Sequence, residues 1–227
     1  MAGALYKQLV IFDCDGVLVD SEPLSARAHE VVLKEAGIDL PAELFASCIG
    51  LKQTDIFARI EAAAGRKIPP EAIARLWPFT RELFETELRP TQGLPAFLAA
   101  LPARRCVASS SHLERIEFSL RLTGLDTAFG GNIFSSQMVA RGKPAPDLFL
   151  FAAQKMGADP AACVVIEDAA PGIEGARAAG MTAIGYLGGR HIGPGHSEVL
   201  RQAGASHLAE DWPAIARLFT KEKLFAV

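Results

Sequence analysis

The chain has 227 residues, of which 50% are hydrophobic and 22% are charged, which is typical of a globular protein with a sizeable core. The formal net charge of -3 leaves no excess of Lys and Arg to neutralise phosphates, which argues against a nucleic-acid-binding protein. No apolar run approaches the roughly 18 residues that span a bilayer, and the N-terminus lacks a secretory pattern. We therefore expect a cytoplasmic protein without nucleic-acid or membrane partners.

The first predicted element is a short, buried strand over residues 8–12. Residues 21–88 then carry only helical patterns, in which Gly37 and Gly65 are typical helix ends and Pro69-Pro70 is a typical helix start. One short helix of this block is expected over residues 41–48, and Gly50 to Gln53 form a turn. We interpret the block as a helical insert over the carboxyl edge of a sheet.

Strands and helices alternate from Arg89 onward. The expected strands cover residues 105–108, 132–135, 163–166, 181–186 and 205–208, and the expected helices cover residues 93–101, 112–122, 146–156, 171–179 and a short C-terminal segment. This alternation predicts an α/β fold with a Rossmann-like parallel sheet. We therefore predict an α/β catalytic core domain formed by residues 1–16 and 90–227, and an all-α helical-bundle cap domain formed by residues 17–89.

Polar side chains follow three of the predicted strands at the point where each strand ends. Asp13 and Asp15 follow the first strand, and residues two apart on an extended backbone face the same side. Ser109-Ser110-Ser111 follows the second strand, and Glu167-Asp168 follows the fourth. Because the carboxyl ends of parallel strands meet at one edge of the sheet, we expect these side chains to form one site.

The residue types at this edge suit phosphate and metal chemistry. Clustered carboxylates would repel one another without a cation, and hard oxygen ligands without His or thiolate favour Mg²⁺. Serine hydroxyls and backbone N–H groups at the start of a helix suit a phosphate. Lys143, in a loop stiffened by Pro144 and Pro146, offers a fixed positive charge. Each signal alone has an ordinary structural explanation, but their ordered occurrence at strand ends favours a phosphate site.

Four segments of the chain resemble the signatures of the haloacid dehalogenase superfamily. They are residues 12–20, 108–111, 142–144 and 166–168. Residues 172–181 are similar to the β-phosphoglucomutase and phosphatase branch, whose members carry a helical-bundle cap. The resemblance spans essentially the whole chain and implies the superfamily's core fold, with the helical block of this chain as the cap.

The resemblance implies phosphoryl transfer through an aspartyl-phosphate intermediate. Asp13 would attack the phosphorus, and Asp15 would act as general acid and then as general base. Mg²⁺ would be held by the side chains of Asp13 and Asp168 and by the backbone carbonyl of Asp15, with Glu167 as a direct ligand or acting through water. The groups that would bind the phosphoryl oxygens are Ser109, the backbone amide of Ser110 and Lys143.

Several reactions of the superfamily compete at this point. Halide displacement and phosphonate hydrolysis are disfavoured, because those relatives lack the second acid that Asp15 supplies here. The phosphonate hydrolases also need a Schiff-base lysine in the cap turn, and the position that best matches it is Gln53, beside Lys52. A phosphatase, a sugar-phosphate mutase and a catalytically silent binding module for phosphorylated metabolites remain.

The cap residues favour the phosphatase. A β-phosphoglucomutase uses a His on the first cap helix and an Arg in the cap turn, and the matching positions here are Ser25 and Gln53, with His29 as the nearest histidine. We therefore expect a phosphatase that acts on a small phosphate ester, with a sugar or sugar-acid phosphate as the best class. Lys52, Gln53 and Ser25 are the candidate specificity residues. Gly188 to His191 are predicted to form a surface loop without a catalytic role. No feature calls for an obligate dimer, so we expect a monomer.

Overall fold

A single parallel sheet organises the α/β part of the molecule. The computed structural model describes residues 9–41, 43–44, 47–48, 51 and 53–221. The strands are β1 (Leu9–Phe12), β2 (Arg104–Ser109), β3 (Ile133–Ser135), β4 (Cys163–Glu167), β5 (Thr182–Tyr186) and β6 (His207–Ala209). They lie in the order β3-β2-β1-β4-β5-β6, and every neighbouring pair is parallel. The predicted α/β fold with a parallel sheet is thus confirmed.

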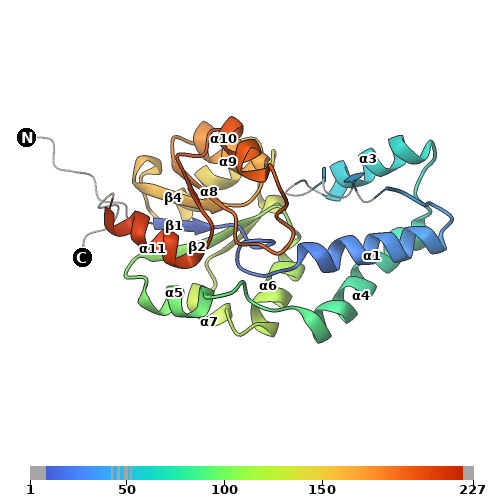
Figure 1. The fold of residues 1–227 in the computed structure, drawn as a ribbon, viewed down its shortest axis with the longest axis horizontal. Helices are drawn as coiled ribbons and strands as arrows, with labels where there is room; N and C mark the ends of the chain where they lie inside the picture. Colours follow the sequence, from blue (N-terminus) through green and yellow to red (C-terminus); the bar gives the residue numbers. More distant parts are fainter. Residues whose placement is uncertain (1–8, 42, 45–46, 49–50, 52, 222–227) are drawn as a thin grey trace, which may run out of the picture.

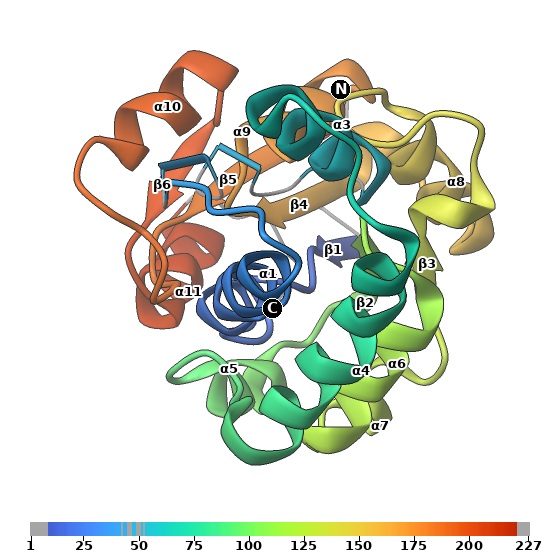
Figure 2. The same cartoon turned by 90° about the vertical axis from the view of Figure 1, so that its right-hand side faces the viewer.

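The central strand β1 is buried on both faces. Val10 and Phe12 face the helices α5 (Leu94–Ala100), α6 (Leu113–Leu122), α7 (Asp126–Phe129) and α11 (Trp212–Lys221). Leu9 and Ile11 face α8 (Asp147–Lys155), α9 (Ala170–Ala178) and α10 (His196–Ala203). Figure 2 shows these two groups of helices on opposite sides of the sheet. Burial on both faces explains the continuous apolar sequence of β1, which is typical of parallel sheets.

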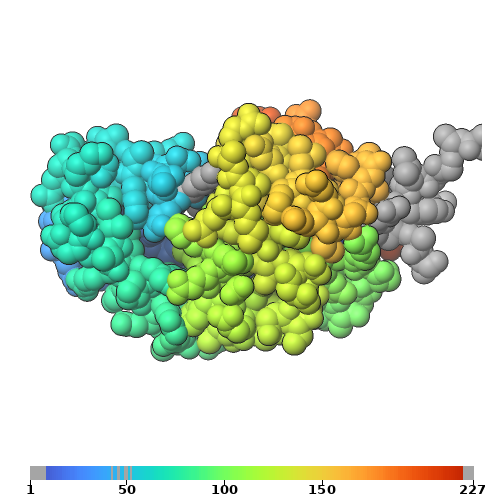
Figure 3. Space-filling view, turned by 180° about the vertical axis from the view of Figure 1, so that it is seen from behind, coloured from blue at the N-terminus to red at the C-terminus, as the bar shows by residue number. Residues whose placement is uncertain are grey.

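Three helices of the inserted block form a third hydrophobic cluster, separate from the two on the faces of the sheet. They are α1 (Glu22–Glu35), α3 (Gln53–Ala64) and α4 (Pro70–Glu87), and the buried members of their cluster are Val32, Leu33, Ile38, Ile60, Ile68, Ala72 and Leu76. These helices extend away from the sheet at one end of the molecule (Figure 1), and a hollow separates part of them from the sheet region (Figure 3). The helix expected over residues 41–48 lies partly outside the described residues.

The sequence prediction missed two helices, α7 and α10, and the 3₁₀ turns η1 (Ser136–Met138) and η2 (Pro160–Ala162). Helix α10 buries only Leu200 and Ala203, so its apolar periodicity is too sparse to mark a helix. Helix α7 is a single turn. None of the helices in the described part of the chain is long and apolar enough to cross a membrane.

Candidate active site

Two acidic side chains follow β1 at the centre of the sheet edge. The backbone N–H of Asp13 donates to the carbonyl of Ile166 over 3.0 Å, so Asp13 continues the pairing of β1 with β4. The chain then turns at Gly16, whose φ is 75°. A Cβ at Gly16 would lie 1.9 Å from Oδ2 of Asp168, so this approach of loop and carboxylate requires glycine. Because β2 and β4 flank β1, the acids lie at the topological switch point of the sheet.

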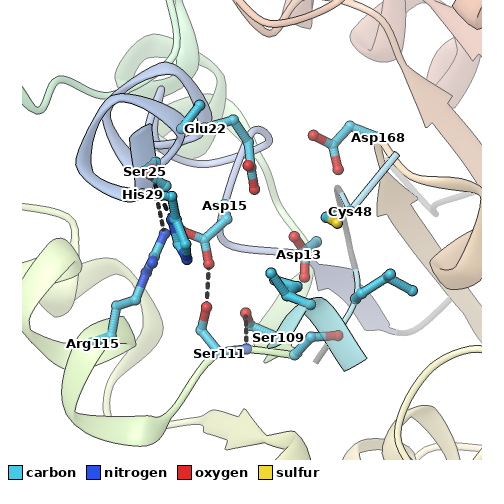
Figure 4. Close-up of a pocket in the computed structure, with 14 residues that line it drawn as sticks. Asp13, Asp15, Glu22, Ser25, His29, Cys48, Ser109, Ser111, Arg115 and Asp168 are labelled. Carbon is cyan, nitrogen blue, oxygen red and sulfur yellow. Dashed lines mark hydrogen bonds and ion pairs between the residues drawn. The ribbon is translucent and has the colours of Figure 1, made fainter. Parts of the chain in front are cut away.

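A cavity of about 90 Å³ opens above these strand ends. Its lining includes residues from the ends of β1, β2 and β4 and from helices α1 and α6. The sequence-predicted residues among them are Asp13, Asp15, Ser25, Ser109, Ser110 and Asp168. Figure 4 shows the labelled side chains of this group arranged around one space. The structure therefore brings residues from four separate parts of the sequence into one pocket.

Lys143 lies beneath the acids as a buried counter-charge. Its Nζ is 2.5 Å from Oδ1 of Asp13 and 2.6 Å from Oε1 of Glu167, and its side chain is 1% exposed. Burial alone would lower the pKa of Lys143, but the two carboxylates outweigh burial and raise it. Lys143 is therefore a permanent cation beside Asp13.

Three carboxylates form the acidic cluster of the site. One oxygen from each of Asp13, Glu167 and Asp168 lies within 4.8 Å of the others. Burial raises the pKa of Asp13 and of Asp168 well above the usual value, and the neighbouring carboxylates add to both shifts. Within the described residues, Oδ2 of Asp168 is buried without a hydrogen-bond partner. Hard oxygen donors with excess negative charge fit Mg²⁺.

The serine loop after β2 is fixed by its own hydroxyls and by the end of β3. The Ser109 Oγ accepts the N–H of Ser111 over 3.1 Å. The hydroxyls of Ser135 and Ser136 donate to the carbonyls of Ser111 and Ser110 over 2.6 and 2.8 Å. The loop is thus held in one conformation at the mouth of the sheet edge, beside Asp13.

The Asp15 carboxylate is held by three donors, of which the sequence analysis placed only Ser111 at the site and did not identify Ser21 or Arg115. Ser21 Oγ donates to Oδ1 over 2.6 Å, Ser111 Oγ donates to Oδ2 over 2.6 Å, and Arg115 Nη2 donates to Oδ1 over 2.7 Å. Burial tends to raise the pKa of Asp15, but Arg115 and the two hydroxyls outweigh it and lower the pKa. The available signal for Arg115 was its place in the first turn of the helix after the serine loop.

The candidate specificity residues fall into three different positions. Ser25 lines the cavity of about 90 Å³ at the strand ends, where its Oγ accepts from Arg115 Nη2 over 2.8 Å. Gln53 instead lines an adjoining cavity of about 480 Å³, whose walls also include Leu51, Trp77 and Arg115. Lys52 lies outside the described residues. Ser25 thus contacts the Asp15 site through Arg115, whereas Gln53 lines the larger adjoining cavity.

The prediction of a surface loop over Gly188 to His191 is wrong for part of that segment. Gly189 is buried, and the side chain of His191 is only 6% exposed. His191 Nε2 lies 3.0 Å from Oδ2 of Asp168, so the loop packs against the acidic cluster. Paired glycines are typical of a solvent-exposed turn, but here a Cβ at Gly189 would meet His191 Cε1 at 2.7 Å. The glycine permits this close packing.

Glu22 is a further acid in the cavity, and it should make stability depend on pH. Burial raises its pKa to about 7, and Asp15 and Asp168 add to the shift. The folded state then binds the proton more tightly than the unfolded state, so stability falls as pH rises from about 4.5 to about 7. In metal-free buffer, the melting temperature of Glu22→Gln should exceed that of the unsubstituted protein increasingly across this range.

A matched control for this prediction is Glu30→Gln, on the same helix but exposed. The melting temperature of Glu30→Gln should match that of the unsubstituted protein at every pH. If the melting temperatures of Glu22→Gln and of the unsubstituted protein change in parallel with pH, the cavity does not raise the pKa of Glu22.

Comparison with known proteins identifies the family. A model of the haloacid dehalogenase-like hydrolase family matches residues 7–180. The chain belongs to the haloacid dehalogenase-like hydrolases. This hydrolase is 31% identical over 212 residues to 6-phosphogluconate phosphatase of Escherichia coli strain K12, with 91% of this chain and 95% of that protein covered. It is 34% identical over 179 residues to fructose-1-phosphate phosphatase YqaB of the same strain, with 77% of this chain and 94% of that protein covered.

Solved structures agree with this assignment. A haloacid dehalogenase family hydrolase from Deinococcus radiodurans, crystallised with bound phosphate and sodium, superposes with a TM-score of 0.79 at 30% identity, covering 98% of this chain and 99% of that chain. The family and the fold that the sequence signatures indicated are therefore confirmed for this haloacid dehalogenase-like hydrolase.

Proposed function

We propose that this hydrolase is a Mg²⁺-dependent phosphatase that acts on a small phosphorylated metabolite through an aspartyl-phosphate intermediate. The main support for this proposal is the position of Asp13 and Asp15 at the switch point of the sheet. Lys143 binds Asp13, and the serine loop lies beside both acids. The curated relatives named above are phosphatases of a sugar phosphate and a sugar-acid phosphate. We therefore propose a sugar or sugar-acid phosphate as the substrate class.

In this proposal each residue of the cavity has a separate task. The Asp13 carboxylate attacks the phosphorus and the ester oxygen leaves, so that an aspartyl phosphate and an alcohol form. Asp15 must first take up a proton, against the influence of Arg115, which lowers its pKa; it then gives that proton to the leaving oxygen and takes one back from the attacking water. Ser109, the Ser110 amide and Lys143 bind the oxygens of the phosphoryl group, where charge is spread in the transition state.

We propose Asp13, the Asp15 carbonyl and Asp168 as the ligands of Mg²⁺. The ion would neutralise charge between the attacking carboxylate and the phosphoryl group when bound. Glu167 fits an indirect role, since its Oε1 accepts from Lys143 and its Oε2 accepts from the N–H of Ala169 over 2.9 Å. Both oxygens are thus engaged, which supports contact with the metal through water.

The helical block completes the proposal as a cap domain of residues 17–89 over a core of residues 1–16 and 90–227. The two hydrophobic clusters of the core and the separate cluster of α1, α3 and α4 support this division. The leaving group would extend into the cavity of about 480 Å³ between cap and core. The β-phosphoglucomutases have a histidine at the position of Ser25. Its absence here favours hydrolysis of the phosphoenzyme over transfer of the phosphoryl group to a second hydroxyl.

A screen of phosphorylated metabolites with Mg²⁺ tests the proposal. We expect release of inorganic phosphate from at least one sugar or sugar-acid phosphate, and loss of activity in EDTA that Mg²⁺ restores. The screen includes β-glucose 1-phosphate with a readout for glucose 6-phosphate. Formation of glucose 6-phosphate faster than phosphate would establish the mutase instead. A folded protein that turns over neither the metabolites nor an aryl phosphate would favour a silent binding module.

A further inference from the structure

A half-buried arginine connects the cap helices to the candidate acid/base residue. Arg115 belongs to the first turn of α6 in the core. Its Nη2 donates to Asp15 Oδ1 and to Ser25 Oγ of α1, and its guanidinium carbon lies 5.1 Å from the ring centre of Phe84 in α4. Figure 4 shows Arg115 and Ser25 next to each other on one side of the cavity, joined by a dashed line. Arg115 therefore contacts Asp15, helix α1 and helix α4 at the same time.

We propose that Arg115 is a positioning residue, which sets the direction of the Asp15 carboxylate and makes that direction depend on the docking of α1 and α4. This inference rests on the proposed function for the role of Asp15. It adds a residue outside the four signature segments to the machinery of proton transfer.

The hydrogen bonds of Asp15 explain why Arg115 would control its direction. Oδ1 accepts from both Ser21 and Arg115, whereas Oδ2 accepts only from Ser111 among the described residues. Two donors on Oδ1 fix that oxygen and leave Oδ2 with free acceptor capacity. Without Arg115, the hydroxyls of Ser21 and Ser111 can rotate with the carboxylate, so that its direction is no longer fixed.

The charge of Arg115 is also supported from the cap side. Its side chain is 20% exposed and lies over an aromatic face, an arrangement that favours a guanidinium. Ser25 orients the same nitrogen that binds Asp15. A shift of α1 or α4 relative to α6 would therefore disturb the Asp15 contact directly.

The expected consequence is a change in leaving-group dependence. General acid catalysis contributes about 10²–10⁴-fold, and its contribution is largest when the leaving oxygen is strongly basic. An alkyl phosphate, such as a sugar phosphate, needs the proton of Asp15, whereas 4-nitrophenyl phosphate has a stable leaving anion. Misdirection of Asp15 should therefore slow the alkyl ester much more than the aryl ester.

The test measures kcat and KM for both esters in Arg115→Met, Arg115→Lys, Ser25→Ala and the control Arg121→Met. Arg121 lies on the same helix with a side chain that is 57% exposed. We expect Arg115→Met to lower kcat for the alkyl ester by about 10²-fold and for the aryl ester by less than about 5-fold, with little change in KM. Arg115→Lys should recover part of the loss, Ser25→Ala should show a smaller loss of the same pattern, and Arg121→Met should match the unsubstituted enzyme.

Three outcomes would overturn the role of Arg115. Equal losses on both esters with a lowered melting temperature would show a purely structural residue. A rise in KM with unchanged kcat would show a substrate-binding residue. An unchanged Arg115→Met enzyme would exclude any contribution. If the unsubstituted protein hydrolyses neither ester, the proposed function is wrong, and the proposed role of Arg115, which depends on it, is wrong as well.

Discussion

Asp13→Asn should reduce the hydrolysis of phosphate esters by on the order of 10⁴-fold or more, because the amide cannot attack phosphorus to form the acyl phosphate. The substitution preserves the size of the side chain and retains an oxygen that can accept from Lys143, whose Nζ lies 2.5 Å from Asp13 Oδ1. It also removes a buried carboxylate whose pKa burial raises well above the usual value. We therefore expect Asp13→Asn to unfold at the same temperature as the unsubstituted protein or higher in metal-free buffer.

The covalent intermediate gives a direct measurement of this role. Asp15→Asn, which lacks the base that activates water, should accumulate the phosphoenzyme from 4-nitrophenyl phosphate, and mass spectrometry after an acid quench should locate the added phosphoryl group on Asp13. The double variant with Asp13→Asn should show no such mass increase. Asp55→Asn, an exposed position in α3, serves as the matched control. Substantial turnover by Asp13→Asn, or a phosphoryl group on another residue, would contradict the assignment of the nucleophile.

Lys143→Met should both inactivate and destabilise the protein. The side chain is 1% exposed and binds Asp13 and Glu167, so its replacement leaves two buried carboxylates without their cation. Breaking a buried ion pair in this way typically lowers the free energy of unfolding by about 3–5 kcal/mol. Activity should fall as well, because we propose that Lys143 also binds the phosphoryl oxygens.

Urea denaturation in EDTA measures the stability effect, and its pH dependence gives a second check. The unpaired acids of Lys143→Met would have raised pKa values in the folded state. The loss in free energy of unfolding relative to the unsubstituted protein should therefore shrink as pH falls and grow as pH rises. Lys67→Met is the control, since its side chain is 88% exposed and its pair with Glu61 lies at the surface. A stability loss for Lys143→Met no larger than that of Lys67→Met would show that the buried pair is not a stabilising contact.

The architecture of the core could be predicted because its signals are local. The apolar run of β1 and the alternation of strands and helices reflect burial within short segments, and both were confirmed. Helix α10 was missed because it has only eight residues, of which Leu200 and Ala203 are buried, too few to give a recognisable repeat.

The candidate residues at the strand ends could also be predicted, because parallel strands place their carboxyl ends together whatever the details of packing. Asp13, Asp15, Ser109 and Asp168 line one cavity, as the topology required. Lys143 lies in a loop, so its residue type and stiff loop offered a positive charge without fixing its position, and the structure places it in contact with Asp13.

The sequence by itself determined which strand ends carry acids and serines, and hence the class of chemistry that they suit. Only the tertiary structure decided how those acids are held. On sequence alone, Arg115 is one of several charged residues on α6, and His191 is part of a glycine-rich turn. The packing of α6 against α1 and α4 places Arg115 on Asp15, and the close fit of Gly16 and Gly189 places His191 beside Asp168. Such contacts depend on distances between elements far apart in the chain, which no local pattern encodes.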